Sequence, residues 1–297
     1  MQSAPPKITC WGELAWDVFA AAEPTLNGSR VLGGSATAVA AQLAALGAEA
    51  TLVSAVGDDP EGAQALSELT QRGVNVSLVQ RSAGATAAVD VRVQPSGEPA
   101  YAASHRLNWA ALAFDCALAS ALVGSDALTF SLFAQGDCLD LGALERAVAH
   151  PKTPWIGCDL NLRRAVPVEV LDRVAQNADL VKLNQREYEL TRRVLGGEEP
   201  ATWLLGRGRT TLVALTSGQH GARLVTRDTV IAQAGRTPPD LVDTVGAGDA
   251  FMAGLTVALL AELPAQEALL RAVTRAESQL TRQGAMPTPR QAQSEPG

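Results

Sequence analysis

Apolar residues along the chain follow two repeating patterns. Short apolar runs typical of buried strands alternate with stretches in which apolar positions recur every three or four residues, as in helices. This alternation favours a mainly parallel sheet covered by helices, so we expect a doubly wound α/β fold. The predicted strands are 51–59, 126–133, 178–184 and 210–218, with a strand-like alternation at 7–19, a strand and its following loop at 153–163, and a hairpin at 222–235; the predicted helices are 32–47, 61–74, 139–150, 168–178, 185–195, 250–262 and 265–282.

Two β segments do not fit this alternation. Residues 85–101 alternate at period two around a Pro-Ser-Gly turn, which predicts a hairpin. This hairpin and the early strand segment fall outside the parallel sheet, so together they could form a small lid from segments near 12–30 and 85–110. Residues 287–297 have little to bury and are expected to be a frayed tail of a single domain that spans 1–297.

The length and charge of the chain limit the number of domains and the classes of binding partner that we expect. The chain has 297 residues, enough for one large α/β domain or two small ones. Its 24 basic and 31 acidic side chains form no basic cluster that we can find, which disfavours nucleic acid and anionic membranes as partners. No run reaches the roughly 18 apolar residues of a membrane span, and residues 1–7 do not resemble a signal peptide. We expect a soluble, cytoplasmic protein.

The candidate chemistry centres on the run DTVGAGDAF, which begins at Asp243 and precedes a long apolar stretch. Glycines here can leave several backbone N–H groups pointing one way at a helix N-terminus, where unpaired donors and the helix dipole favour an anion. One interpretation is that the Gly246 and Gly248 amides hold phosphoryl oxygens while Asp249 takes a proton from an attacking hydroxyl. The alternative is helix capping by Asp243, Thr244 or Asp249, with the glycines serving only the turn.

This run resembles the signature of the ribokinase-like (PfkB) family of sugar and nucleoside kinases, and segments from about Gly12 to Gly284 follow the family's order. The resemblance implies a ribokinase-like fold with a small β-sheet lid, and transfer of the γ-phosphoryl group of Mg-ATP to a sugar hydroxyl. It implies Asp249 as the general base and an anion hole formed by the backbone of Gly246, Ala247 and Gly248. It also allows a monovalent cation as an activator and a homodimer that forms through the lid.

The acceptor would bind near Asp17 and a pair of glycines. Asp17 could accept two sugar hydroxyls, and the family places a sugar-binding aspartate here; an exposed loop aspartate is the alternative. Gly33 and Gly34 would let the backbone approach a ligand at a helix N-terminus, or would serve only a tight turn. The family pattern then has a substrate-binding asparagine where this chain has Ala38, which can neither donate nor accept a hydrogen bond. The identity of the acceptor therefore stays open.

A second group of acceptor candidates follows a predicted strand. Asp159, Asn161 and Arg163 alternate on one side of the strand end, where α/β sheets place ligands. The guanidinium of Arg163 could bind a phosphate or a carboxylate. A surface salt bridge is the alternative for this residue.

The nucleotide side has weaker signals. Asn184 and Glu187 match the family's Asn-x-x-Glu motif, whose oxygens suit magnesium through water; a helix cap is the alternative, and the two are compatible. No glycine loop is followed by the lysine of a P-loop. The expected nucleotide-binding residues are Asn184, Thr216, Gly218, Gly221, Thr244, Gly246 and Gly248.

The motifs that surround these residues are most similar to the fructokinase branch of the family. They include GELAWDVF, the run DLNLR that ends at Arg163, and Lys182-Leu183-Asn184. An arginine at the position of Arg163 also occurs in kinases of 2-keto-3-deoxygluconate. A hypothesis of another class, motivated by Ala38, is a catalytically weak relative that binds a sugar or nucleotide as a sensor. A dinucleotide-dependent hydride transferase is disfavoured, because WGELAWD lacks the glycine fingerprint.

Overall fold

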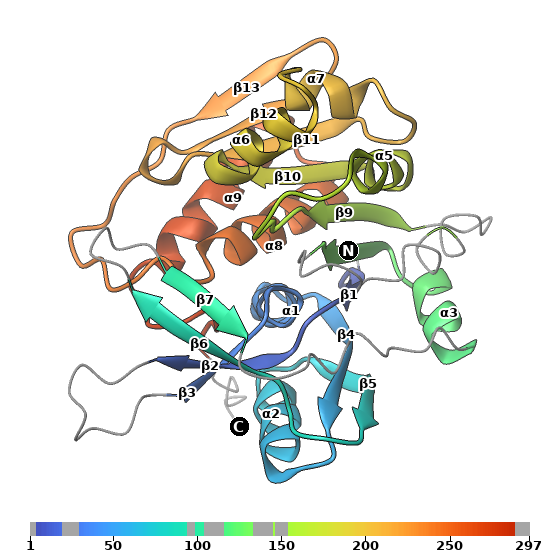
Figure 1. Cartoon of the computed structure of the whole chain (residues 1–297), viewed down its shortest axis with the longest axis vertical. Helices are drawn as coiled ribbons and strands as arrows, with labels where there is room; N and C mark the ends of the chain where they lie inside the picture. The colour runs from blue at the N-terminus through green and yellow to red at the C-terminus, as the bar shows by residue number, and fades with distance from the viewer. Residues whose placement is uncertain are drawn as a thin grey trace.

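The central sheet has its strands in the order β13-β12-β11-β10-β9-β8-β1-β4-β5 in the computed structural model, which describes residues 4–19, 30–93, 99–103, 116–132, 145 and 154–288 (Figure 1). The strands from β11 to β5 in this order pair in parallel, whereas β12 and β13 add an antiparallel edge. The strands are β1 (Lys7–Trp11), β4 (Glu49–Gly57), β5 (Asn75–Ser82), β8 (Ala127–Ser131), β9 (Trp155–Asp159), β10 (Leu180–Asn184), β11 (Leu212–Thr216), β12 (Ala222–Val225) and β13 (Val230–Gln233).

Helices cover both faces of this sheet. Neighbouring side chains of a strand point to opposite faces, and in β1 Ile8 and Cys10 join one buried cluster while Trp11 joins the other. The first cluster includes residues of α1 (Ser35–Ala45), α2 (Pro60–Gln71), α8 (Ala247–Leu260) and α9 (Ala265–Gln279). The second includes residues of α3 (Cys116–Val123), α5 (Val168–Asn177), α6 (Gln185–Val194) and α7 (Pro200–Leu205), or packs against them.

The chain leaves the central sheet early to build a second one. Gly12, at φ +151°, turns the chain after β1, and a Cβ at this position would lie 2.9 Å from the Cβ of Ala36. The second sheet has the order β3-β2-β6-β7, with a parallel pair between β2 and β6 (Figure 1). Its strands are β2 (Ala15–Phe19), β3 (Arg30–Gly33), β6 (Ala88–Val93) and β7 (Pro99–Ala103).

The predicted α/β fold with a small second sheet is confirmed, with local differences. The strand-like alternation at 7–19 is divided between the two sheets, in line with the lid segment expected near 12–30, whereas β5, α3 and α7 were not predicted. The helix expected from residue 250 begins at Ala247, because Gly246 adopts a left-handed conformation and Gly248 fits within the first turn. Most of the helix expected at 139–150 lies outside the described residues. Within the described part of the chain, no helix has the length and apolar character needed to cross a bilayer.

Candidate functional site

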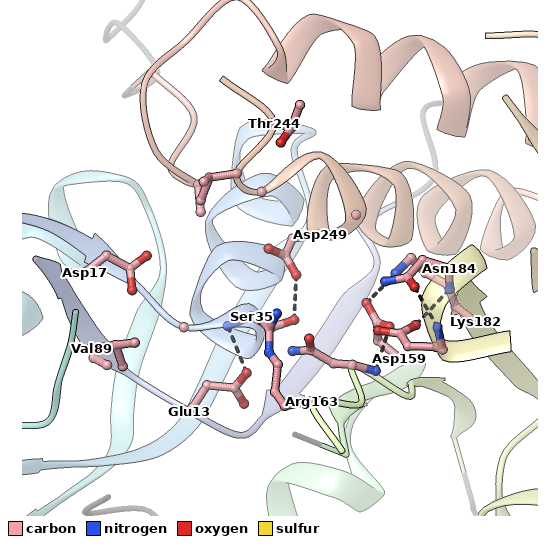
Figure 2. Close-up of a pocket in the computed structure, with 18 residues that line it drawn as sticks. Glu13, Asp17, Ser35, Val89, Asp159, Arg163, Lys182, Asn184, Thr244 and Asp249 are labelled. Carbon is pink, nitrogen blue, oxygen red and sulfur yellow. Dashed lines mark hydrogen bonds and ion pairs between the residues drawn. The ribbon is translucent and has the colours of Figure 1, made fainter. Parts of the chain in front are cut away.

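A cavity of about 200 Å³ lies where the carboxyl ends of β9 and β10 meet the second sheet and the N-terminus of α8 (Figure 2). It is at the strand ends, where ligands bind in open α/β sheets. The cavity brings together most of the predicted site residues from distant parts of the chain. Its lining is Glu13, Ala15, Asp17, Gly34, Ser35, Val89, Asp159, Asn161, Arg163, Lys182, Asn184, Glu187, Thr244, Val245, Gly246, Gly248, Asp249 and Ala285.

The first turn of α8 presents Asp249 to this cavity. Gly246 is the N-cap at φ +80°, and the helix has no side-chain cap, so the interpretation of Asp243, Thr244 or Asp249 as a helix cap is wrong. Asp243 instead stabilises the loop, because its carboxylate accepts hydrogen bonds from the amides of Val245 (2.5 Å) and Gly284 (2.8 Å). The Asp249 carboxylate is left to face the cavity, where it accepts a hydrogen bond from the Ser35 hydroxyl at 2.5 Å (Figure 2).

Gly246 and Gly248 have different roles at the start of α8. A Cβ on Gly246 would lie 2.5 Å from the Cα of Ala285, so a side chain would collide with backbone. Gly248 lies in the first turn of α8, whose amides have no partner within the helix. The Ala247 amide is partly engaged, because it donates to the carbonyl of Thr244 at 3.3 Å. The Gly248 amide, beside the Asp249 carboxylate, is therefore the better placed to receive an anion.

The pKa of Asp249 is raised to about 6. Burial is the main cause, and the Asp159 carboxylate adds to it, while the Ser35 hydrogen bond and the nearby Lys182 and Arg163 lower the pKa. A carboxylate with a pKa just below neutrality can act as a general base at physiological pH.

Two further carboxyl groups border the same space. Asp17, on β2, is only 5% exposed, so the interpretation as an exposed loop aspartate is wrong. Glu13 is 3% exposed and accepts a hydrogen bond from the Ser35 amide at 3.0 Å. Burial is the main cause that raises the pKa of each to about 7, and the charge of Asp249 adds to it. Both groups therefore titrate close to neutral pH.

The paired glycines make room for these carboxyl groups. Gly33 is the last residue of β3, and a Cβ there would lie 2.3 Å from the Asp17 carboxylate. Gly34, the N-cap of α1 at φ +98°, lines the cavity, and its Cβ would lie 2.4 Å from the carbonyl oxygen of Glu13. The close approach of backbone in this turn places the N-terminus of α1 at the cavity wall.

The DLNLR segment reaches the cavity through a loop. β9 ends at Asp159, and Asn161 has φ +41°, so Asn161 and Arg163 lie in the loop that was expected after the strand and do not alternate along the strand itself. Asp159, Asn161 and Arg163 nevertheless all line the cavity. The Asn161 amide is held by a hydrogen bond of 3.1 Å to the Ser131 hydroxyl. The left-handed turn at Asn161 thus brings Arg163 back over the site.

Asn184 and Glu187 form a capping box at the start of α6. Asn184 accepts from the Glu187 amide at 2.9 Å, and Glu187 accepts from the Asn184 amide at 2.8 Å. The helix-cap interpretation is confirmed. Both residues also line the cavity, so they remain available to a ligand there. Burial, with the Asp159 charge adding to it, raises the pKa of Glu187 to about 7.

The other predicted nucleotide-binding residues divide into two groups. Thr244 lines the main cavity, and Thr216 lines a neighbouring one that shares Asn184 with it. Among the residues that the structure describes, Gly218 and Gly221 are not part of either lining. Gly221 has a structural reason to be glycine, because a Cβ would lie 2.0 Å from the carbonyl oxygen of Gln233.

A family model described as pfkB family carbohydrate kinase matches residues 6–292. The chain belongs to this family. A fructokinase from Klebsiella pneumoniae is 29% identical to this carbohydrate kinase in an alignment of 254 positions that covers 77% of each chain. A ribokinase structure from Thermotoga maritima has a TM-score of 0.80 at 20% identity and covers 95% of this chain and 96% of its own. A fructokinase structure from Xylella fastidiosa with bound ATP has a TM-score of 0.79 at 22% identity and covers 95% of each chain. The predicted ribokinase-like fold is confirmed.

Sequence reasoning missed three polar residues of the kinase's cavity. Glu13 is the one acidic residue in the run CWGELAW, Ser35 directly follows the glycine pair, and Lys182 is the one charged residue in the strand LVKLN. A charged residue inside an otherwise apolar run was the available signal for two of them. The serine had no such signal, because its contact with Asp249 joins residues 214 positions apart.

The position of Ala38 gives a test of how tightly this part of the kinase is packed. Ala38 is fully buried in α1 and packs with Val245 and Ala285. We expect Ala38→Asn to lower the free energy of unfolding by about 1–3 kcal/mol, because the amide would overpack the cluster and lose its hydrogen bonds to water. Urea denaturation measures this. The control Ala38→Val adds similar bulk without polarity and should cost less; an Asn variant as stable as the wild type would contradict the expected packing.

Proposed function

We propose that this carbohydrate kinase transfers the γ-phosphoryl group of ATP to a hydroxyl of a sugar, with fructose as the favoured acceptor. The observation that carries the proposal is the position of Asp249, in the first turn of α8 beside the Gly248 amide and directed into the cavity. A base and an anion-binding helix N-terminus at one point are what in-line transfer to a hydroxyl requires.

The proposed mechanism assigns a step to each side of the cavity. Asp17 and Asn161 accept and donate hydrogen bonds that orient the sugar hydroxyls, while the second sheet limits access of water. Asp249 takes the proton of the attacking sugar hydroxyl while the oxygen of that hydroxyl forms a bond to the γ-phosphorus. The bond from that phosphorus to the bridging oxygen breaks, and its electron pair leaves with ADP. The amides of the Gly246–Gly248 turn stabilise the charge on the transferred group.

The residues at the nucleotide side fit a magnesium ion that is held through water. In the capping box, the side-chain oxygen of Asn184 and one carboxylate oxygen of Glu187 each accept a backbone hydrogen bond. Among the described residues, no group of three or more His, Cys, Asp or Glu side chains could hold a metal directly. Asn184 and Glu187 would therefore contact the water shell of an ion carried by the phosphates. When bound, the ion would neutralise phosphate charge.

Fructose is favoured by the curated relative, which is a fructokinase at 29% identity. A second acceptor, 2-keto-3-deoxygluconate, is favoured by Arg163, whose guanidinium lines the cavity and lowers the pKa of Asp17, Glu13 and Asp249. A cation in this place would pair with a carboxylate on the acceptor. The hypothesis of a sensor without activity is less well supported, since Asp249 and the glycine turn are intact.

An ADP-release assay with Mg-ATP against fructose, 2-keto-3-deoxygluconate, ribose, tagatose and adenosine tests the proposal. Turnover of fructose above the others supports it, and preference for the keto acid supports the second acceptor. An Arg163→Met variant separates the two acceptors, because it should reduce activity on the keto acid more than on fructose. Binding of sugar without ADP release for any acceptor would favour the sensor hypothesis instead.

The acid side of the pH profile should depend on Ser35. Asp249 works as a base only when ionised, so kcat/KM should fall as the pH drops through about 6. Ser35 donates to this carboxylate and lowers its pKa; Ser35→Ala should therefore move the fall by about one unit to higher pH. Asp17, Glu13 and Glu187 titrate in both proteins, so the difference between the two profiles reports the serine.

The matched control for Ser35→Ala is Ser54→Ala in β4. Ser54 is buried, and its hydroxyl has no hydrogen-bond partner among the described residues. This variant should leave the profile unchanged. Coincident profiles for Ser35→Ala and the wild type would contradict the assignment of Asp249 as the group that titrates.

A further inference from the structure

Lys182 is a buried cation in the wall of the cavity. It lies on β10, is 3% exposed, and its ammonium bonds to the Asp159 carboxylate at 2.6 Å. A lysine this deeply buried has lost most of its hydration, and this loss is unfavourable even when the ammonium is paired. It nevertheless lines the cavity rather than packing within the apolar core (Figure 2). The ammonium is therefore presented to whatever ligand occupies this space.

The ammonium lies next to the helix N-terminus that we assign to the phosphoryl group. A Cβ on Gly248 would be 3.2 Å from the Nζ of Lys182, so the lysine occupies the space beside this glycine. The Gly248 amide and the Lys182 ammonium thus lie on one wall. Asn184, two residues further along the same strand, lines the same cavity and its nucleotide-side neighbour. Lys182 therefore lies beside the expected phosphate-binding turn and on the same strand as Asn184.

The cavity lining is rich in carboxyl groups, and Lys182 supplies positive charge within it. The lining contains the carboxyl groups of Glu13, Asp17, Asp159, Glu187 and Asp249, and the cationic side chains among its described residues are Arg163 and Lys182. A phosphoryl group that enters this acidic cavity needs positive charge close to its oxygens. Arg163 approaches from the β9 loop, beside the acceptor residues. Lys182 approaches from β10, on the nucleotide side.

We propose that Lys182 is a further catalytic residue whose ammonium contacts the terminal phosphoryl group of the nucleotide beside the Gly248 amide, with Asp159 as the residue that positions it. This inference rests on the proposed kinase function. An ammonium carries three N–H donors, and the bond to Asp159 uses one of them. The other two N–H donors can stay hydrogen-bonded to the phosphoryl oxygens as the group is transferred from ADP to the acceptor, because the lysine side chain is flexible and its ammonium group can rotate.

The alternative is that Lys182 only neutralises Asp159 and Glu187. A neutraliser would affect ADP and ATP alike, because both nucleotides would meet the same disturbed wall. A contact with the terminal phosphoryl group would affect ATP and spare ADP. The two roles are therefore separated by comparing nucleotides with and without the third phosphate.

The test is calorimetric titration of ADP and of the imido analogue of ATP, each with magnesium and without sugar, into wild type and Lys182→Met. We expect the variant to bind the imido analogue about tenfold or more weakly and ADP within a few-fold of wild type. In the assay with sugar, kcat should fall by about 10² or more while the KM for the sugar stays near that of the wild type. Lys182→Arg should recover part of the affinity for the imido analogue.

Other outcomes overturn the inference. An equal loss of affinity for both nucleotides would assign Lys182 the neutralising role. Unchanged affinity for both nucleotides together with a normal kcat would show that Lys182 does not contact the nucleotide. Wild-type protein that binds neither nucleotide would overturn the proposed function together with this inference. If Lys182→Met alone does not fold because Asp159 is left unpaired, the double variant Lys182→Met/Asp159→Asn removes both charges and is compared in the same titrations.

Discussion

Asp249→Asn should reduce kcat by about 10²–10⁴, the range expected when a general base is lost. Asparagine keeps the shape of the side chain and can still accept the hydrogen bond that Ser35 donates to Asp249 at 2.5 Å. It cannot take a proton from the acceptor hydroxyl. The ADP-release assay measures the loss, and calorimetry with ADP should find nucleotide affinity close to that of the wild type.

The control for this variant is Asp228→Asn. Asp228 is an exposed aspartate between β12 and β13, away from the cavity lining, so the same chemical change should leave kcat unaltered. Near-normal turnover in Asp249→Asn would remove Asp249 from the role of base. Loss of folding in Asp249→Asn is not expected, because a buried carboxyl with a pKa raised by burial is replaced by a neutral group of the same size.

Gly246→Ala should impair both folding and activity. Gly246 has φ +80°, and the added Cβ would lie 2.5 Å from the Cα of Ala285, which is backbone and cannot move aside cheaply. The free energy of unfolding should fall by about 1–3 kcal/mol or more from this strain. Because the turn also aims the first amides of α8, kcat should fall by about 10²–10³, as when one oxyanion donor is lost.

Gly196→Ala is the control that separates the backbone strain of a left-handed alanine from the effect of the position of Gly246 beside Ala285 and the cavity. Gly196 has φ +66°, but no described residue lies within 4 Å of an added Cβ, and it follows α6 outside the cavity lining. It should show the cost of a left-handed alanine alone, with unchanged kcat in the folded protein. If urea denaturation and the kinase assay give the same values for both variants, the contact between Gly246 and Ala285 does not constrain the turn.

The parts of this protein that the sequence determined are those that depend on neighbours in the chain. The order of strands and helices follows from local periodicity. The capping box of Asn184 and Glu187 follows from a spacing of three residues, which a helix brings together on its own. The run DTVGAGDAF predicted a helix N-terminus with Asp249 beside it, because a glycine at the N-cap and an acid in the first turn are local features.

Only the tertiary structure decided which polar groups meet. Ser35 and Asp249 are 214 residues apart, and Asp159 and Lys182 lie on neighbouring strands. Glu13, between β1 and β2, accepts a hydrogen bond from the Ser35 amide at the start of α1. The burial of Ala38 against Val245 likewise depends on packing of α1 against the loop before α8. Apolar periodicity specifies which face of an element is buried but not which partner covers it. The cavity exists because parallel strands end at one edge, and contacts across that edge are set by the packing of the whole sheet.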